Sequence, residues 1–230
     1  MSVAFVKNVA SNTASNSTTV AVTVPAAGCA AGNVLAVRLY NWSSSVTVSS
    51  VADTQGNTYA EWVAKISGSD ATFLWKSKLT TALVSGNTIT ATFSAMANCG
   101  ISVEEFSGLD NTEDGENKAT GTSTTPSVAL TPTVVGVLVG NLGIQNSVLP
   151  SYTEDADTDN GDSWHSMTAV TIGTSTQIKG AYKIPTSAAL NTYNPTLGSS
   201  SEWYAQLGSL KATPRSLLWN PRALSTIYSL

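Results

Sequence analysis

Hydrophobic and polar residues alternate with a period of two along most of the chain. The alternation is clearest in Thr18–Val24, where Val20, Val22 and Val24 fall on one face, and again in Thr88–Ser94. Because successive side chains of a strand point to opposite faces of a sheet, this spacing predicts half-buried β-strands. No segment shows the 3.6-residue period of an amphipathic helix, so the pattern predicts an all-β protein.

Short clusters of turn-forming residues separate the predicted strands. Ser67–Asp70 and Ser85–Asn87 combine glycine with serine, aspartate or asparagine, which favour tight turns. The remaining expected strands cover residues 33–42, 46–51, 59–66, 72–79, 101–106, 134–144, 168–174, 177–184 and 202–211. About a dozen short antiparallel strands joined by such turns predict a β-sandwich, either a jelly roll or an immunoglobulin-like fold.

Three stretches differ from the alternating segments. Residues 111–126 hold glycine, serine, threonine and several carboxylates, so we expect an exposed loop and a seam between two halves. Residues 151–166 predict a second polar loop. The nearly continuous apolar run at 134–144 instead predicts a strand buried on both faces. The predicted sandwich domain spans residues 1–212.

The end of the chain has a different composition. Residues 213–230 contain Pro-Arg-x-Leu twice, beginning at Pro214 and Pro221. Proline is disfavoured in helix interiors and central strands, so we expect an extended arm. Its many large apolar groups predict that it either folds back on its own sandwich or docks on another chain, and the arginine after each proline favours docking. The predicted partner-binding residues are Arg215, Leu217, Leu218, Trp219, Arg222 and Leu224.

The overall composition supports a folded β-protein with little attraction for nucleic acid. Charged residues make up 11 % of the chain, whereas a soluble domain usually has about 25 %. Hydrophobic residues make up 42 %, which is enough for a core and argues against disorder. The net charge is −4. Residues 1–162 carry a net −8 and residues 163–230 a net +4, so an acidic body is followed by a basic end.

The sequence predicts a protein made in the cytoplasm, with no membrane association. No apolar segment typical of a signal peptide follows Met1, and the run at 134–144 is too short to span a bilayer. In a reducing compartment, Cys29 and Cys99 are expected to be buried free thiols, although the sequence does not exclude that they pair.

Catalytic chemistry is not predicted. The single histidine, His165, lies in Gly161–His165, which contains both Gly-Asp-Ser and Asp-x-x-His. One class of serine esterases has these two patterns far apart in the sequence, whereas here they overlap, so we regard the match as a coincidence. Glu104 and Glu105 are adjacent in a predicted strand and therefore point to opposite faces, whereas glycosidase carboxyl groups converge. We expect one of these glutamates to be solvated.

A loop of alternating acids is the best candidate for an ion site. Asp155, Asp157 and Asp159 have the spacing of the first three ligands of a calcium loop, but glycine comes one position late and the closing glutamate is missing. We therefore favour a solvated loop without a cofactor and keep calcium as the alternative. Trp164, in the same polar stretch, is the first candidate for stacking on a sugar.

Several motifs resemble a family of β-sandwich proteins found in tailed bacteriophages and bacterial genomes. The motifs are Asp-x-x-Gly-Asn-x-Tyr at Asp53–Tyr59, a tryptophan-bearing strand at Phe73–Lys78, Thr88–Ser94, Val103–Asp110, and a late Trp-x-Ala strand at Trp203–Lys211. The resemblance covers most of the predicted sandwich domain but not the arm.

The resemblance implies a capsid decoration or accessory virion protein without enzymatic activity. Its expected partners are major capsid or other virion proteins, and it is expected on the capsid surface as a homo-oligomer or bound to the particle. The alternative is a carbohydrate-binding or receptor-binding domain of a fibre or cell-surface protein.

Overall fold

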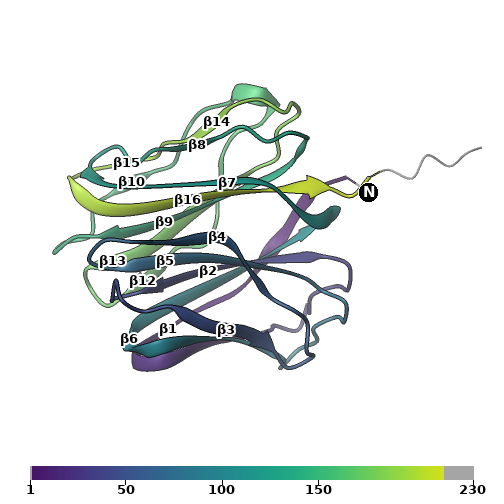
Figure 1. Ribbon diagram of the computed structural model, residues 1–230, viewed down its shortest axis with the longest axis horizontal. Helices are drawn as coiled ribbons and strands as arrows, with labels where there is room; N and C mark the ends of the chain where they lie inside the picture. The colour runs from purple at the N-terminus through teal and green to yellow at the C-terminus, as the bar shows by residue number, and fades with distance from the viewer. Residues whose placement is uncertain (1, 215–230) are drawn as a thin grey trace, which may run out of the picture.

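The computed structural model describes residues 2–214, which form antiparallel β-sheets packed in layers (Figure 1). The first sheet has the order β1-β6-β2-β5-β4, with β3 also paired to β6. Its strands are β1 (Ala4–Thr23), β2 (Val34–Asn41), β3 (Val48–Asp53), β4 (Ala60–Ser67), β5 (Ala71–Lys78) and β6 (Thr88–Ser107). The predicted turn at Ser67–Asp70 and the strands on either side of it are confirmed, and these strands form the antiparallel β4–β5 pair.

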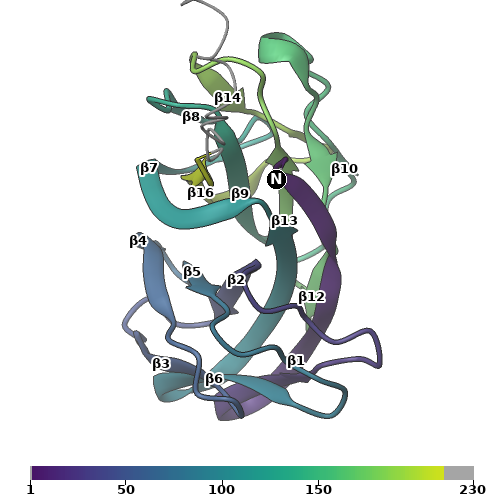
Figure 2. The same ribbon diagram turned by 90° about the vertical axis from the view of Figure 1, so that its right-hand side faces the viewer.

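The second sheet has the order β11-β13-β9-β16-β7, with β12 paired to β13. Two-stranded sheets, β8 with β14 and β10 with β15, cover its outer face (Figure 2). These strands are β7 (Leu109–Ser123), β8 (Val128–Leu130), β9 (Gly136–Gln145), β10 (Tyr152–Thr153), β11 (His165–Ser166), β12 (Val170–Ile172), β13 (Thr176–Lys183), β14 (Asn191–Tyr193), β15 (Thr196–Leu197) and β16 (Ser201–Ala212). The short 3-10 turn η1 spans Asp159–Gly161.

Four apolar clusters hold the layers together in the described residues, which confirms the predicted all-β sandwich, and the fourth is centred on Tyr40, Ile178 and Tyr204. The first sheet bends, so that β1, β3 and part of β6 enclose Val22, Leu39 and Phe73 against β2 and β5. The second core lies between the two sheets, and the third lies between the second sheet and the short outer strands. Strands β2 and β9 each have core on both faces, as predicted for the apolar run that includes β9.

The expected loop at 111–126 is wrong, because most of it belongs to β7, which pairs antiparallel with β16. Strand β7 is an edge strand with mostly exposed side chains, so its polar composition resembles that of a loop. The chain passes between the sheets at Gly108 instead. Gly108 has φ +75°, and a Cβ there would lie 2.3 Å from the Ser2 carbonyl oxygen, so glycine suits this crossing.

The expectation that one of the two adjacent glutamates is solvated is also wrong. Arg38 of β2 donates from Nε and Nη2 to the Glu104 carboxylate at 3.1 and 2.6 Å, and both side chains are fully buried. The Arg38 Nη2 also donates to the Thr168 carbonyl at 2.7 Å, which joins the two halves of the molecule. Glu105 is buried elsewhere, where it accepts from Asn33 at 2.7 Å and lies 3.3 Å from the Lys7 ammonium.

Both cysteines are buried as free thiols, as predicted. Desolvation by burial, together with the nearby Glu105 carboxylate, raises the pKa of Cys29 to about 12. Burial likewise raises the pKa of Cys99 to about 11. Because the thiolate is the reactive form, neither thiol is suited to nucleophilic or redox chemistry near neutral pH.

In residues 2–214, no helix has both the length and the apolar composition needed to cross a membrane.

Candidate functional site

The two ends of the described chain meet at one end of the molecule (Figure 2). The Thr213 N–H, just after β16, donates to the Gly108 carbonyl at 2.8 Å. Gly108 in turn lies against Ser2, so both chain ends are held at the crossing between the sheets. Residues that are far apart in the sequence therefore line a shared surface.

A groove of about 550 Å³ opens at this end, and we call it the terminal groove. Its lining is mostly apolar and includes Val3, Val135, Ile184, Pro185, Ala212 and Pro214. Val135 and its neighbour Val134 are 40 and 41 % exposed, so two adjacent valines present apolar surface here. The apolar run had suggested that both valines belong to the buried strand. They lie just before it instead, because β9 begins at Gly136.

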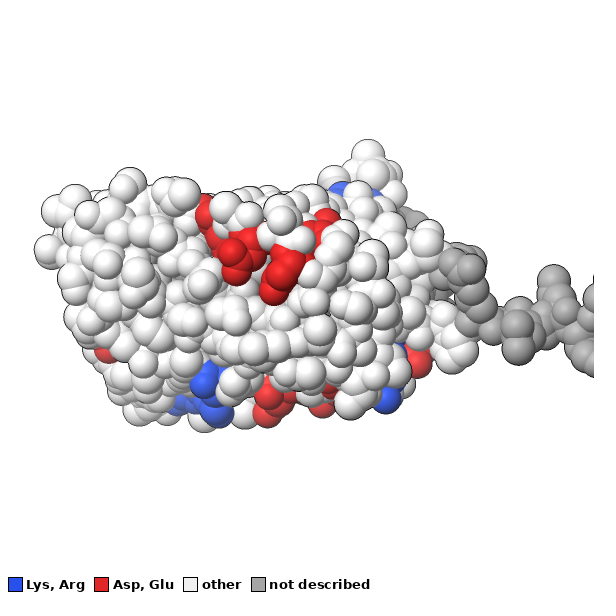
Figure 3. Space-filling view, turned by 90° about the horizontal axis from the view of Figure 1, so that it is seen from above, with Lys and Arg blue, Asp and Glu red and all other residues white. Residues whose placement is uncertain are grey.

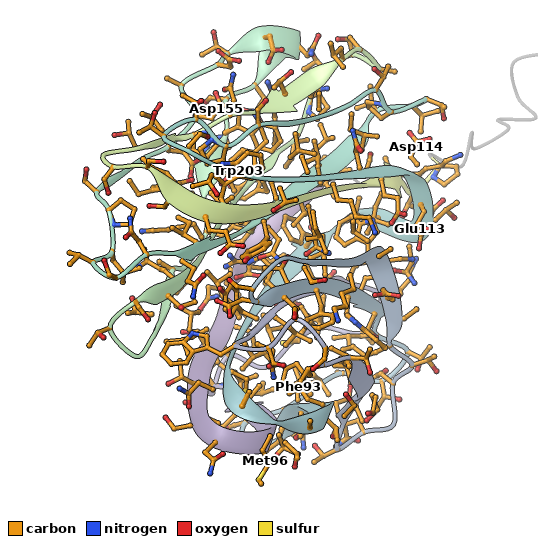
Figure 4. All side chains as sticks on the ribbon, turned by 60° about the vertical axis from the view of Figure 1, so that its left-hand side comes forward. Phe93, Met96, Glu113, Asp114, Asp155 and Trp203 are labelled. Atoms are coloured by element: carbon orange, nitrogen blue, oxygen red, sulfur yellow. The ribbon has the colours of Figure 1, made fainter. Side chains whose placement is uncertain are left out.

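Asp114 holds the valine wall of the terminal groove in place. Its carboxylate accepts from the backbone N–H groups of Thr133 and Val134 at 2.9 and 2.8 Å, and also from the Thr133 hydroxyl. The Lys211 ammonium lies 3.8 Å away. Burial by itself would raise the pKa of Asp114, but these hydrogen bonds and Lys211 together hold it below the ordinary value. Figure 4 shows Asp114 near the point where the described chain leaves the molecule.

A second aspartate supports the opposite wall. Asp162 accepts from the Ile184 N–H at 2.8 Å and from His165 at 3.0 Å. Burial would raise the pKa of Asp162, but the bonds from Ile184, His165 and Ser163 outweigh it and lower the pKa. The hydrogen bonds of His165 and Ser163 to Asp162 thus support the wall, and no catalytic role is needed to explain them.

The acidic loop, residues 154–162, adjoins this second wall. The Thr186 N–H of the wall donates to the Asn160 carbonyl at 2.8 Å, so the loop is fixed at the rim of the groove. The loop contains five carboxylates. Figure 3 looks down on this side of the molecule and shows acidic side chains gathered there. An apolar groove therefore lies beside a negatively charged surface.

The three aspartates proposed as calcium ligands do not converge. Asp155 is buried and accepts from the N–H groups of Asp157 and Asn194 at 2.9 and 2.8 Å. Asp159 pairs with Lys183, while Asp157 is exposed. Within residues 2–214, no group of three His, Cys, Asp or Glu side chains could hold a metal ion.

Trp164 belongs to the core and does not form a surface platform. It is 5 % exposed, its indole N–H donates to the Thr192 carbonyl at 2.9 Å, and its ring packs against Tyr193. The Lys183 ammonium lies over the Trp164 ring, 5.6 Å from the ring centre. This burial removes the aromatic face that the sugar-binding interpretation had assigned to Trp164.

A smaller groove of about 350 Å³ lies between β3 and β4. Its lining includes the half-buried Trp75, the charged residues Glu61 and Lys65, and Phe73, which is itself 1 % exposed and belongs to the first core. Lys65 donates to the Val46 carbonyl at 2.7 Å, and burial lowers the pKa of its ammonium. We call this site the aromatic groove.

The predicted arm residues Arg215, Leu217, Leu218, Trp219, Arg222 and Leu224 lie outside the described residues. What the structure does describe is the base of the arm: Pro214 lines the terminal groove. Sequence analysis missed this groove, although the adjacent Val134 and Val135 after Pro132 were a signal that could have been noticed.

Comparisons with protein-family models, curated proteins and solved structures find no match for this chain. The resemblance to a phage family therefore stays a prediction.

Proposed function

We propose that this protein is a non-enzymatic structural protein of a phage particle, a capsid decoration or accessory protein that attaches to a neighbouring chain through residues 213–230. The observation that carries the proposal is the place where the arm begins. The arm begins at an apolar groove beside an acidic surface, and its own sequence supplies apolar residues and two arginines.

The strand that precedes the arm is well suited to bear a load. Strand β16 is 12 residues long and is paired on both sides, with β7 and with β9. A pull on the arm would therefore act along two hydrogen-bonded ladders, and these must shear before the strand can leave the sheet. An attachment point anchored in this way favours a mechanical role for the arm.

The arm has the composition of a protein interface. Tryptophan and arginine are enriched among residues that dominate binding energy, and truncating such a residue commonly costs about 2 kcal/mol or more. We expect Leu217, Leu218 and Trp219 to enter an apolar surface of the partner, while Arg215 and Arg222 contact acidic groups at its rim.

The test is co-sedimentation with capsids built from the coat protein encoded alongside this chain. The full chain should pellet with the capsids. A variant lacking residues 215–230 should remain in the supernatant with an unchanged melting temperature, and Trp219→Ala should lose most binding, whereas the matched arm variant Ser225→Ala should bind normally. Full binding by the truncated chain would show that the arm is not the attachment element.

Carbohydrate binding is a second candidate, and the aromatic groove favours it. Ligand pockets commonly combine an apolar lining with a few polar groups, and Phe73, Trp75, Glu61 and Lys65 provide that combination. If a fibre-type glycan binds there, Trp75→Ala and Glu61→Gln should abolish signal on a glycan array, whereas Trp219→Ala should not. An array on which the intact chain binds no glycan would contradict this candidate.

A further inference from the structure

We propose that the terminal groove receives the arm of a second copy of this chain, so that copies link head to tail. This inference rests on the proposed docking role of the arm and adds a second copy of this chain to the partners that the arm binds. Leu217, Leu218 and Trp219 of one copy would fill the groove of the next, and the arginines would face the acidic loop.

The groove has the size and chemistry for these side chains. Its volume of about 550 Å³ falls in the range of well-formed binding pockets, about 300–1,000 Å³. Its walls are hydrogen-bonded in place through Asp114 and Asp162, so binding would require little ordering of the receiving surface. Val135 on one wall is 40 % exposed, and covering it would remove apolar surface from water.

The charges of the two surfaces are complementary. Residues 213–230 contain Arg215 and Arg222 and no aspartate or glutamate. The acidic loop contains five carboxylates, of which Asp155 is buried, Asp159 is paired with Lys183 and Asp162 with His165. Glu154 and the exposed Asp157 are therefore left to face an arginine. An extended arm spans at most about 3.3 Å per residue, so the two arginines can lie up to about 23 Å apart. One arm can therefore contact both the groove and the acidic loop at its rim.

The sequence at the base of the arm favours a second copy over the arm's own groove. Pro214 is itself part of the lining, and a proline biases the preceding residue, Thr213, towards an extended conformation. Residues 215–219 contain no glycine, asparagine or aspartate, and the first turn-favouring pair is Asn220-Pro221. Ser216 is the one turn-favouring residue between Pro214 and Trp219, so a return of Trp219 to its own groove would need the chain to reverse within the five residues after Pro214.

Head-to-tail contact has a definite consequence for assembly. Because the arm and the groove are different surfaces, each copy gives one arm and receives another, which produces a closed ring or an open chain. The same arrangement predicts that two defective copies can complement each other. A copy without an arm still has a groove, and a copy with a blocked groove still has an arm.

The experiment mixes two such copies and measures mass by light scattering after size exclusion. One copy lacks residues 215–230. The other carries Val135→Lys, which places a positive charge on the exposed groove wall; Val3→Lys is a second blocked version, in case the first does not fold. Val148→Lys, at a valine 75 % exposed elsewhere, is the matched control.

We expect the unmodified chain and Val148→Lys to assemble, each defective copy to be monomeric, and their mixture to form a 1:1 dimer. Monomers of the unmodified chain at all concentrations, or normal assembly of both blocked copies, would overturn the inference. If copies assemble through the groove but capsid binding does not need the arm, the proposed function fails and this inference stands. If the arm is needed for capsid binding but copies never assemble, this inference fails and the proposed function stands.

Discussion

Asp114 acts on the terminal groove at the scale of a single residue. Its carboxylate accepts three hydrogen bonds from Thr133 and Val134, the turn that presents Val135 to the groove. Hydrogen bonds to a buried charged group contribute more than neutral ones, about 1.5–3 kcal/mol. One side chain therefore determines where a groove wall lies.

We expect Asp114→Asn to lower the free energy of unfolding by about 2 kcal/mol, because a neutral amide cannot accept all three bonds equally well. The exposed, nearby Glu116→Gln is the matched control and should change it by less than about 0.5 kcal/mol. Urea denaturation of both variants measures the difference. A loss no larger than that of the control would show that Asp114 does not hold the wall.

The lowered pKa values of Asp114 and Asp162 also predict a pH dependence. A carboxyl group whose pKa is lower in the folded state stabilises the protein above its unfolded pKa, and this contribution is lost as pH falls through the folded value. We therefore expect the melting temperature to decline below about pH 4, with a smaller decline in Asp114→Asn. Equal declines in both proteins would contradict the assignment of this effect to Asp114.

At the scale of elements, the Asp-x-x-Gly-Asn-x-Tyr motif is a structural turn that joins two segments. Asp53 accepts from the Asn57 side chain and from the Tyr59 hydroxyl, both at 2.9 Å. Asn57 accepts from the N–H groups of Thr80 and Thr81 at 2.8 and 2.9 Å, which fixes the end of β5 against the end of β3. Hydrogen bonds within the fold thus explain the motif, without a ligand.

Asn57→Ala should lower the free energy of unfolding by about 2–3 kcal/mol, because it leaves two partly buried N–H groups without their acceptor. Gln55→Ala, an exposed position in the same turn, should change it by less than about 0.5 kcal/mol. Thermal denaturation distinguishes the two. Equal effects would mean that the network does not stabilise the turn.

Alternation along the sequence was sufficient to predict the strands whose two faces differ. It predicted β16, where Trp203, Ala205 and Leu207 share one core, and the two strands at 168–174 and 177–184, which the structure pairs as β12 and β13. It failed for β7, because an edge strand can be polar throughout. It also could not predict the terminal groove, since Val3, Val135 and Ile184 meet only through long-range pairing of both sheets.

For the molecule as a whole, Arg38 is paired with Glu104 inside the first sheet and joins that sheet to the other half through its hydrogen bond to the Thr168 carbonyl. Removing one partner of such a pair leaves an unpaired buried charge and commonly costs about 3–5 kcal/mol, whereas replacing both by apolar groups costs much less. Arg38→Met should therefore destabilise the protein more than the double variant Arg38→Met/Glu104→Leu. Chemical denaturation measures both, and a double variant that is the less stable would contradict this account.

The molecule has two different ends, because both ends of the described chain lie at the same one (Figures 1 and 2). Residues from both chain ends line the terminal groove. In our account the fold positions this groove, and the arm makes the contact between chains.

The most direct test of this contact is photo-cross-linking from the arm. A benzophenone amino acid replaces Trp219, and chains grown in normal and in ¹⁵N medium are mixed before irradiation. The account predicts cross-linked peptides in which position 219 of one isotopic form joins the segment around Val135 or Ile184 of the other. Cross-links confined to a single isotopic form, or none at all between arm and groove, would contradict it.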